Sequence, residues 1–120
     1  DTVFIASPLT SNKRINKIVN KTSGFVYVVS RLGVTGARAA LEGSTLKLIK
    51  RIRKFTKKPL CVGFGISKPE HVKAVIKAGA DGAIVGSAIV NLIEKNSSNT
   101  SKMLKKIGLY AKSMKKSTEN

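Results

Sequence analysis

Short apolar segments that end at glycine or a small residue alternate with amphipathic segments along this chain of 120 residues. The apolar segments are rich in β-branched residues, which is typical of parallel strands covered on both faces. They cover residues 3–6, 25–30, 60–62 and 82–85, and the amphipathic segments cover 11–20, 44–55, 67–77, 88–94 and 102–115. The sequence therefore predicts an α/β fold in which strands and helices alternate.

Serine residues precede several of the predicted helices. Ser11, Ser44 and Ser67 each stand where a side-chain oxygen would cap the first turn of a helix. Pro69 and Glu70 follow Ser67, and both residues are favourable in a first turn. We expect all three serines to be N-caps.

Right-handed crossovers put such helices on one side of a curling sheet, or on both sides of a doubly wound sheet. The additional short helix at 88–94 favours the TIM (βα)8 barrel, where the loops after the last strands often hold a phosphate. A complete barrel takes about 250 residues, so the chain supplies about four βα units, a half-barrel. We expect residues 1–120 to form one half of a single barrel domain, with a disordered tail at 116–120. The other half would come from a longer polypeptide or a second copy.

Glycine turns follow the predicted strands at three places. They are residues 30–36, 63–67 and 82–87, which read SRLGVTG, GFGIS and GAIVGS. Parallel strands present their carboxyl ends at one edge, where glycine lets backbone N–H groups approach a phosphate. These turns predict a phosphate pocket at that edge.

The chain is strongly basic, with 23 Lys and Arg residues against 6 Asp and Glu residues and a net charge of +17. Nucleic acid is the obvious partner for such a charge. However, the basic residues are spread over several predicted helices, and there are only 4 Phe and 2 Tyr residues for base stacking. We therefore predict solvated helix faces and no nucleic-acid partner, with a polyanion-binding surface as the alternative. No apolar run reaches the roughly 18 residues of a membrane helix.

Single cysteine and histidine residues limit metal and redox chemistry. Cys61 lies within an apolar segment, so we expect a buried and unreactive thiol, in keeping with a cytoplasmic protein. His71 stands beside Glu70 in a predicted helix, and we expect it to be exposed rather than a metal ligand. Asp81 precedes its strand, which predicts a turn residue at the edge away from the pocket. We predict no metal site.

The glycine turns resemble those of a known family, the α chain of tryptophan synthase. Residues 30–36 are similar to the mobile loop after that family's sixth strand, and residues 63–67 with Pro69 and Glu70 are similar to the turn after its seventh. Residues 86–90 and 93–96 resemble its eighth strand and phosphate helix. The resemblance covers nearly the whole chain and places it in the C-terminal half of the family's barrel.

The resemblance implies a lyase of tryptophan biosynthesis that cleaves indole-3-glycerol phosphate to indole and glyceraldehyde 3-phosphate. It assigns phosphate binding to Gly36, Gly65, Gly86 and Ser87. It further implies that Thr35 helps to close the site, and that Tyr27 and Phe64 line the indole pocket. Taken locally, the glycines could be plain turn residues, Ser87 a plain N-cap, and the two aromatic residues core residues.

The resemblance also implies partners and missing catalysts. The family pairs with a pyridoxal-phosphate β chain in an α2β2 heterotetramer, so no cofactor is expected in this chain. Its catalytic Glu and Asp come from the N-terminal half of the barrel. Here the acidic residues are Asp1, Glu42, Glu70, Asp81, Glu94 and Glu119, and none follows a predicted strand directly. We expect no catalytic residue in this chain and no activity from the chain alone.

Two other functions fit the same pattern. One is a fragment of another phosphate-binding barrel, such as an isomerase of histidine or tryptophan biosynthesis, which would prefer aminated ribose phosphates. The other is a non-catalytic basic half-barrel that binds nucleic acid, which would bind DNA or RNA with a steep dependence on salt.

Overall fold

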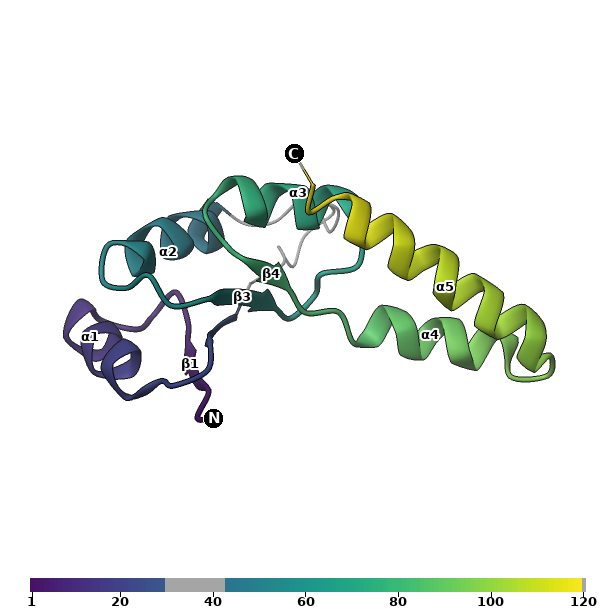
Figure 1. The fold of residues 1–120 in the computed structure, drawn as a ribbon, viewed down its shortest axis with the longest axis horizontal. Coiled ribbons are helices and arrows are strands. Elements are labelled where there is room, and N and C mark those ends of the chain that lie inside the picture. Colours follow the sequence, from purple (N-terminus) through teal and green to yellow (C-terminus); the bar gives the residue numbers. More distant parts are fainter. Residues whose placement is uncertain (30–42, 120) are drawn as a thin grey trace.

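A computed structural model of the protein describes residues 1–29 and 43–119. Within these ranges strands and helices alternate, as the sequence predicts (Figure 1). The elements are β1 (Phe4–Ala6), α1 (Asn12–Lys21), β2 (Val26–Val29), α2 (Gly43–Arg53), β3 (Leu60–Gly63), α3 (Pro69–Lys77), β4 (Gly82–Ala83), α4 (Ser87–Asn96) and α5 (Thr100–Lys116).

The strands form one parallel sheet in the order β1-β2-β3-β4. Tyr27 lies opposite Ile5 on one side and Cys61 on the other. Each strand pairs with the strand that precedes it in the sequence, always on the same side. Right-handed crossovers therefore place the connecting helices on one face of the sheet. A doubly wound sheet would reverse direction partway along the strand order. The predicted half-barrel is therefore confirmed.

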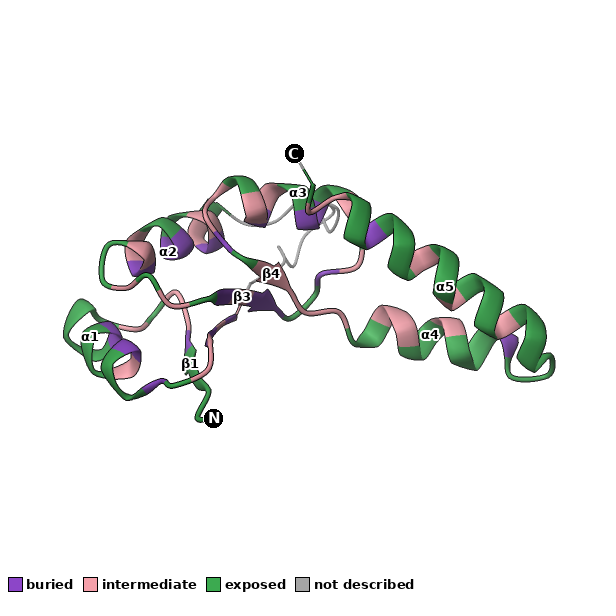
Figure 2. Cartoon of the chain, viewed as in Figure 1, coloured by how far each residue is buried: buried purple, intermediate pink, exposed green. Residues whose placement is uncertain are grey.

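The hydrophobic core lies between the sheet and helices α1, α2 and α3 (Figure 2). In β2, Val26 and Val28 are fully buried, whereas Tyr27 and Val29, which alternate with them, are only half-buried. The helices contribute Ile15, Leu48, Ile49, Ile52, Val72 and Val75 to this core. The expectation that both faces of the strands are covered is thus wrong for this chain, since four strands only partly enclose their concave face.

Helices α4 and α5 form a hairpin that projects from the rest of the molecule (Figure 1). Asn99 caps α5, because its side chain accepts a hydrogen bond from the Lys102 N–H at 2.9 Å. Met114, near the other end of α5, is buried where this helix meets α3. Both helices extend beyond the predicted ranges 88–94 and 102–115, and backbone hydrogen bonds continue through residues 117–119.

A side-chain network holds the amino ends of β3 and β4 together. Arg53, at the end of α2, donates hydrogen bonds to the Gly79 carbonyl at 2.8 and 3.1 Å and to the Lys58 carbonyl at 3.0 Å. It also pairs with the Asp81 carboxylate, which accepts the Leu60 N–H at 2.8 Å. Asp81 is therefore a structural residue at the edge away from the predicted pocket, as the sequence indicated.

Two further basic side chains bind backbone carbonyls. Lys58 Nζ donates to the Val19 carbonyl at 2.7 Å and to the Thr22 carbonyl, which satisfies the end of α1. Arg51 donates to the Thr10 carbonyl at 2.6 Å. Part of the positive charge thus stabilises the fold and is not a solvated helix face.

The local details correct several predictions. Ser11 is the N-cap of α1, as expected, but α2 already includes Gly43, so Ser44 lies inside its first turn. The N-cap of α3 is Lys68, without a side-chain cap hydrogen bond, so Ser67 is not a cap. Strand β4 spans only Gly82–Ala83, although the Ile84 N–H still donates to the Val62 carbonyl at 2.8 Å.

His71 and Cys61 both differ from their predicted environments. His71 is only 2% exposed, so the expectation of a surface histidine is wrong. It shares the inward face of α3 with Val72 and Val75. Cys61 is half-buried rather than fully buried, because it points to the concave face of the sheet. Burial raises the pKa of its thiol, and the negative charge of Asp81 raises it further.

The described part of the chain, residues 1–29 and 43–119, lacks both a membrane-spanning helix and a cluster of metal ligands. None of its helices is long and apolar enough to cross a membrane. None of its His, Cys, Asp and Glu side chains gather in groups of three or more that could hold a metal ion.

Candidate functional site

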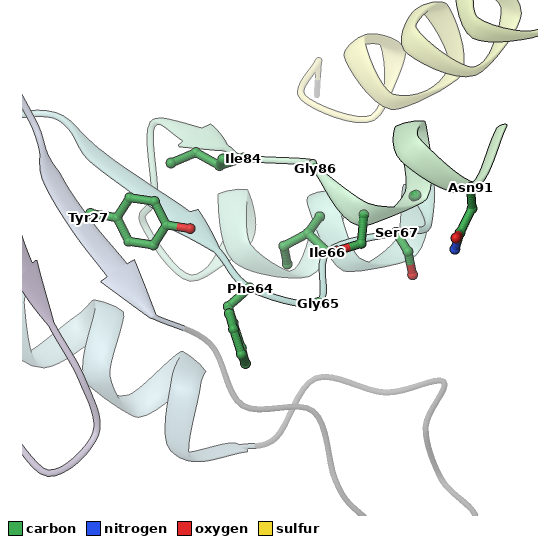
Figure 3. A pocket seen from close by; sticks show the side chains of 10 residues that line it. Tyr27, Phe64, Gly65, Ile66, Ser67, Ile84, Gly86 and Asn91 are labelled. Carbon is green, nitrogen blue, oxygen red and sulfur yellow. The ribbon is translucent and has the colours of Figure 1, made fainter. Parts of the chain in front are cut away.

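A pocket of about 570 Å³ opens where β2, β3 and β4 end and α4 begins (Figure 3). Its walls come from β2, from the segments that follow β3 and β4, and from the first turns of α4. The lining residues are Tyr27, Phe64, Gly65, Ile66, Ser67, Ile84, Gly86, Ser87, Ala88 and Asn91. The pocket therefore lies at the carboxyl edge of the sheet, where the glycine turns were expected to meet.

Tyr27 crosses from β2 toward β3, and glycine at position 63 makes room for it. A Cβ added at Gly63 would lie 2.1 Å from the Tyr27 hydroxyl oxygen and 2.6 Å from Cζ of the ring. It would also lie 3.2 Å from Cβ of Ile84 on the far side. A larger residue at position 63 is thus incompatible with this ring position, so Gly63 determines where the aromatic wall of the pocket stands.

The turn after β3 has an unusual backbone. Phe64 and Gly65 have φ values of 74° and 87°, both in the left-handed region. For a bulky residue such as Phe64 this conformation is an outlier that the surrounding structure has to stabilise, and such outliers cluster at functional sites. Phe64 is 71% exposed, and Figure 3 shows its ring beside the pocket.

The opposite wall is the beginning of α4. Gly86 is its N-cap, and because glycine has no side chain, no side-chain acceptor caps the first turn. The Gly86 carbonyl accepts the N–H groups of Ile89 and Val90 at 2.9 and 3.2 Å, as the first helical bonds of α4. The N–H groups of the first turn carry the positive end of the helix dipole, which favours an anion there. The Ser87 hydroxyl stands in the same turn.

Charged side chains do not line this pocket within residues 1–29 and 43–119. Glu70 forms an exposed ion pair with Lys68 at 3.9 Å, and Asp81 belongs to the network at the other edge. An anion in this pocket would therefore be held by backbone N–H groups and hydroxyl groups. Such donors suit a phosphate group, which glycine lets approach the backbone closely.

The structure brings most of the predicted site residues together. Tyr27, Phe64, Gly65, Gly86 and Ser87 all line the pocket. The predicted loop residues Thr35 and Gly36 lie outside the described residues. The roles assigned to all of these residues stay predictions.

Ile66, Ser67 and Ile84 also line the pocket and lie in the predicted glycine turns, although no individual role was assigned to them, and sequence reasoning missed Asn91. Helical spacing could have found Asn91, because it stands four residues after Ser87 on the same face of α4. Ser67 was expected to be a helix cap within the predicted pocket turn 63–67. It lines the pocket, as that turn predicted, but it does not cap α3.

Known proteins are similar to this chain over nearly its whole length. The family model described as "Tryptophan synthase alpha chain" matches residues 1–119. This chain belongs to the tryptophan synthase alpha chain family. The resemblance seen in the glycine turns is therefore confirmed.

Individual relatives agree with this assignment. The chain is 48% identical over 119 residues to the tryptophan synthase alpha chain of Methanoregula boonei, which covers 99% of this chain and 45% of that relative. It is 56% identical over 96 residues to the same protein of Methanocaldococcus jannaschii, covering 80% of this chain and 34% of the relative. The chain thus spans less than half the length of these curated relatives.

Solved structures of the family share the fold. A mutant tryptophan synthase alpha-subunit of Pyrococcus furiosus has a TM-score of 0.78 and 36% identity, covering 94% of this chain and 44% of that one. A chain from a structure of the tryptophan synthase α2β2 complex of the same organism has a TM-score of 0.76 and 42% identity. That match covers 88% of this chain and 42% of the other. The architecture of this chain is therefore that of half a tryptophan synthase alpha barrel.

Proposed function

We propose that this chain supplies the phosphate-binding half of a tryptophan synthase alpha barrel, whose complete form cleaves indole-3-glycerol phosphate to indole and glyceraldehyde 3-phosphate. The observation that carries the proposal is the pocket between the Phe64–Ser67 turn and the beginning of α4. It combines a helix N-terminus with a glycine turn at the carboxyl edge of a parallel sheet. Barrels of this class bind phosphate in such a place.

Within this pocket the roles divide by chemistry. Backbone N–H groups at Gly65, Gly86 and Ser87 hold the phosphate, with the Ser87 hydroxyl as a further donor and Gly36 contributing from the preceding loop. Tyr27 and Phe64 provide aromatic surface for the indole ring. Thr35 helps to close the site. The net charge of +17 attracts the anionic substrate over a longer range.

The cleavage itself needs a general acid at the indole carbon and a general base at the glycerol side. We assign this pair to carboxylates of the N-terminal half of the barrel, and we propose that the 120 residues alone are inactive. A β chain that carries pyridoxal phosphate is the proposed partner for the indole product, in an α2β2 assembly in the cytoplasm. A chain of the α2β2 complex of Pyrococcus furiosus is one of the structures that this chain matches.

A pair of glycine substitutions tests the phosphate site. An added Cβ meets no atom within 4 Å at Gly86 or at Gly108 in α5, so alanine fits the fold at both positions. Gly86 lines the pocket, whereas Gly108 does not. Titration calorimetry with glyceraldehyde 3-phosphate should therefore show about tenfold weaker binding for Gly86→Ala, the loss that about 1.4 kcal/mol represents. Gly108→Ala should bind as the unsubstituted chain does.

Equal binding by both variants would contradict the phosphate site.

Competition between indole-3-glycerol phosphate and an aminated ribose phosphate separates the lyase from a related isomerase, since only the lyase prefers the indole compound. Indole release should appear when the N-terminal half of the barrel is added to the chain, and not before. Indole release by the chain alone would contradict the proposed division of labour.

A further inference from the structure

The backbone of Ser67 forms hydrogen bonds with side chains of two different helices. Its N–H donates a hydrogen bond to His71 Nδ1 at 3.3 Å, and its carbonyl accepts one from the Tyr110 hydroxyl at 2.9 Å. His71 belongs to α3. Tyr110 belongs to α5 and comes 43 residues after Ser67 in the sequence. The two peptide groups that flank Ser67 are thus both fixed by side chains that do not themselves line the pocket.

These contacts lie next to the strained part of the pocket wall. Phe64 and Gly65 adopt left-handed conformations just before Ser67, and such backbone persists only where the surrounding structure determines it strongly. His71 is 2% exposed, so its ring has little freedom to move. The contacts at Ser67 therefore fix the end of a turn whose beginning is strained.

Helix α5 also contacts the helix that begins at the other wall of the pocket. It forms a hairpin with α4, whose first turn carries Gly86 and Ser87, and it contacts α3. Tyr110 therefore connects the turn after β3 to the helix that supports the opposite wall. The distance between the N–H groups of the two walls has to match the size of one phosphate group. A contact that fixes this distance, such as the hydrogen bond from Tyr110 to Ser67, therefore affects the affinity for an anion.

We propose that Tyr110 and His71 are positioning residues of the anion pocket, which hold Ser67 so that the two pocket walls stand at the spacing a phosphate group requires. The proposal rests on the proposed function in taking a phosphate group as the ligand. It assigns a role in substrate binding to α5. The Tyr110 hydroxyl group acts through Ser67 and does not itself line the pocket. Burial raises the pKa of Tyr110, so its hydroxyl remains a donor at neutral pH.

The first test removes only the hydroxyl group of Tyr110. In the full chain, Tyr110→Phe should weaken the binding of glyceraldehyde 3-phosphate by about three- to tenfold, the loss that one net hydrogen bond corresponds to. Ile107→Val is the matched control, because Ile107 is half-buried one turn earlier on α5 and does not line the pocket. This control should lower the thermal stability to a similar extent and leave the affinity unchanged. Equal loss of affinity in both variants, or none in Tyr110→Phe, would overturn the proposal.

The second test uses the acceptor at position 71. His71→Gln keeps a side-chain acceptor and should bind glyceraldehyde 3-phosphate within about twofold of the unsubstituted chain, whereas His71→Leu lacks one and should bind several-fold more weakly. Affinities are compared at a temperature where circular dichroism shows every variant folded. A glutamine variant as weak as the leucine variant would contradict a role through the Ser67 N–H group.

A ligand-independent measurement separates this proposal from the proposed function. Amide hydrogen exchange at residues 65–67 should be about tenfold faster in Tyr110→Phe than in Ile107→Val, because the turn then opens locally more often. If the unsubstituted chain binds no phosphate compound, the proposed function fails, and these exchange rates still decide whether Tyr110 positions the turn. Equal exchange rates in the two variants would overturn the positioning role.

Discussion

The two edges of this sheet are built from opposite kinds of interaction. At the amino edge, the Arg53 guanidinium binds carbonyl groups of Gly79 and Lys58 and the carboxylate of Asp81. At the carboxyl edge, the described walls of the pocket carry no charged side chain, and the turn after β3 has left-handed backbone at Phe64 and Gly65. One edge satisfies its polar groups within the chain, and the other is where we propose that a ligand binds.

This difference explains where each kind of residue is found. Side-chain hydrogen bonds at the amino edge connect α2 to the segment before β4, and Gly79, whose carbonyl accepts two of them, has a left-handed φ of 108°. The carboxyl edge depends on glycine, because backbone N–H groups reach a ligand only where side chains leave room. The comparison therefore predicts that substitutions at the amino edge change stability and leave ligand affinity alone, while those at the carboxyl edge change affinity.

The largest expected effect is at Arg53. Arg53→Ala removes hydrogen bonds to three carbonyl groups, those of Thr56, Lys58 and Gly79, and the ion pair with Asp81. We expect the free energy of unfolding to fall by about 3 kcal/mol, since partly buried acceptors are left unpaired. Urea denaturation measures this change.

The neighbouring residue provides the control for Arg53. Lys54 is exposed and follows Arg53 directly, so Lys54→Ala should change the free energy of unfolding by less than about 0.5 kcal/mol. Under conditions where Arg53→Ala is folded, its affinity for glyceraldehyde 3-phosphate should equal that of the unsubstituted chain. A selective loss of affinity would erase the distinction between the two edges.

Gly63→Ala should have the next largest effect. The added Cβ would lie 2.1 Å from the Tyr27 hydroxyl oxygen, so the ring has to move, at a cost of about 1–3 kcal/mol. Unlike Arg53→Ala, this variant should also weaken the binding of indole-3-glycerol phosphate, because Tyr27 lines the pocket.

A double-mutant cycle checks the cause of the Gly63→Ala effect. If the clash with Tyr27 is responsible, the combination of Gly63→Ala with Tyr27→Ala should be less destabilised than the sum of the single variants. Strictly additive losses would show that the alanine at position 63 acts through something other than the ring.

Lys58→Met should cost less, about 1–2 kcal/mol in the free energy of unfolding. The ammonium group donates to carbonyls at the end of α1, including that of Val19 at 2.7 Å. Lys57→Met is the control, because Lys57 is exposed and adjacent. Equal effects of the two substitutions, measured by thermal unfolding, would mean that the Lys58 contacts contribute nothing to stability.

The smallest effect concerns the reactivity of Cys61 between the two edges. Burial, and then the charge of Asp81, raise the pKa of this thiol, and only the thiolate reacts with iodoacetamide. Alkylation of the folded chain should therefore reach its half-maximal rate at a higher pH than alkylation of the same chain in urea. A midpoint at the same or a lower pH in the folded chain would contradict this environment.

Much of the fold could be predicted because its signals are local. Apolar segments that end at glycine, separated by amphipathic segments, predicted the order of strands and helices that the structure shows. Helix starts were less predictable, since serine is also common in first turns and loops, and Ser44 and Ser67 are not caps. His71 could have been placed correctly, because it lies on the same helix face as Val72 and Val75.

The site was predictable only in part, for a physical reason. Glycine turns at the ends of parallel strands pointed to Gly65 and Gly86, and both line the pocket. The supports of the pocket and of the opposite edge are non-local. Nothing near Tyr110 indicates a bond to Ser67, and nothing near Arg53 indicates its contacts with Gly79. Such pairs become visible only once the chain is folded.

Amide chemical shifts during titration with glyceraldehyde 3-phosphate show directly whether the phosphate site lies at the carboxyl edge. We expect the N–H resonances of Gly65, Gly86 and Ser87 at the carboxyl edge to shift with a single affinity, and those of Gly79 and Asp81 at the amino edge to stay in place. Shifts at the amino edge, or none at Gly86 and Ser87 under saturating ligand, would contradict the assignment of the phosphate site.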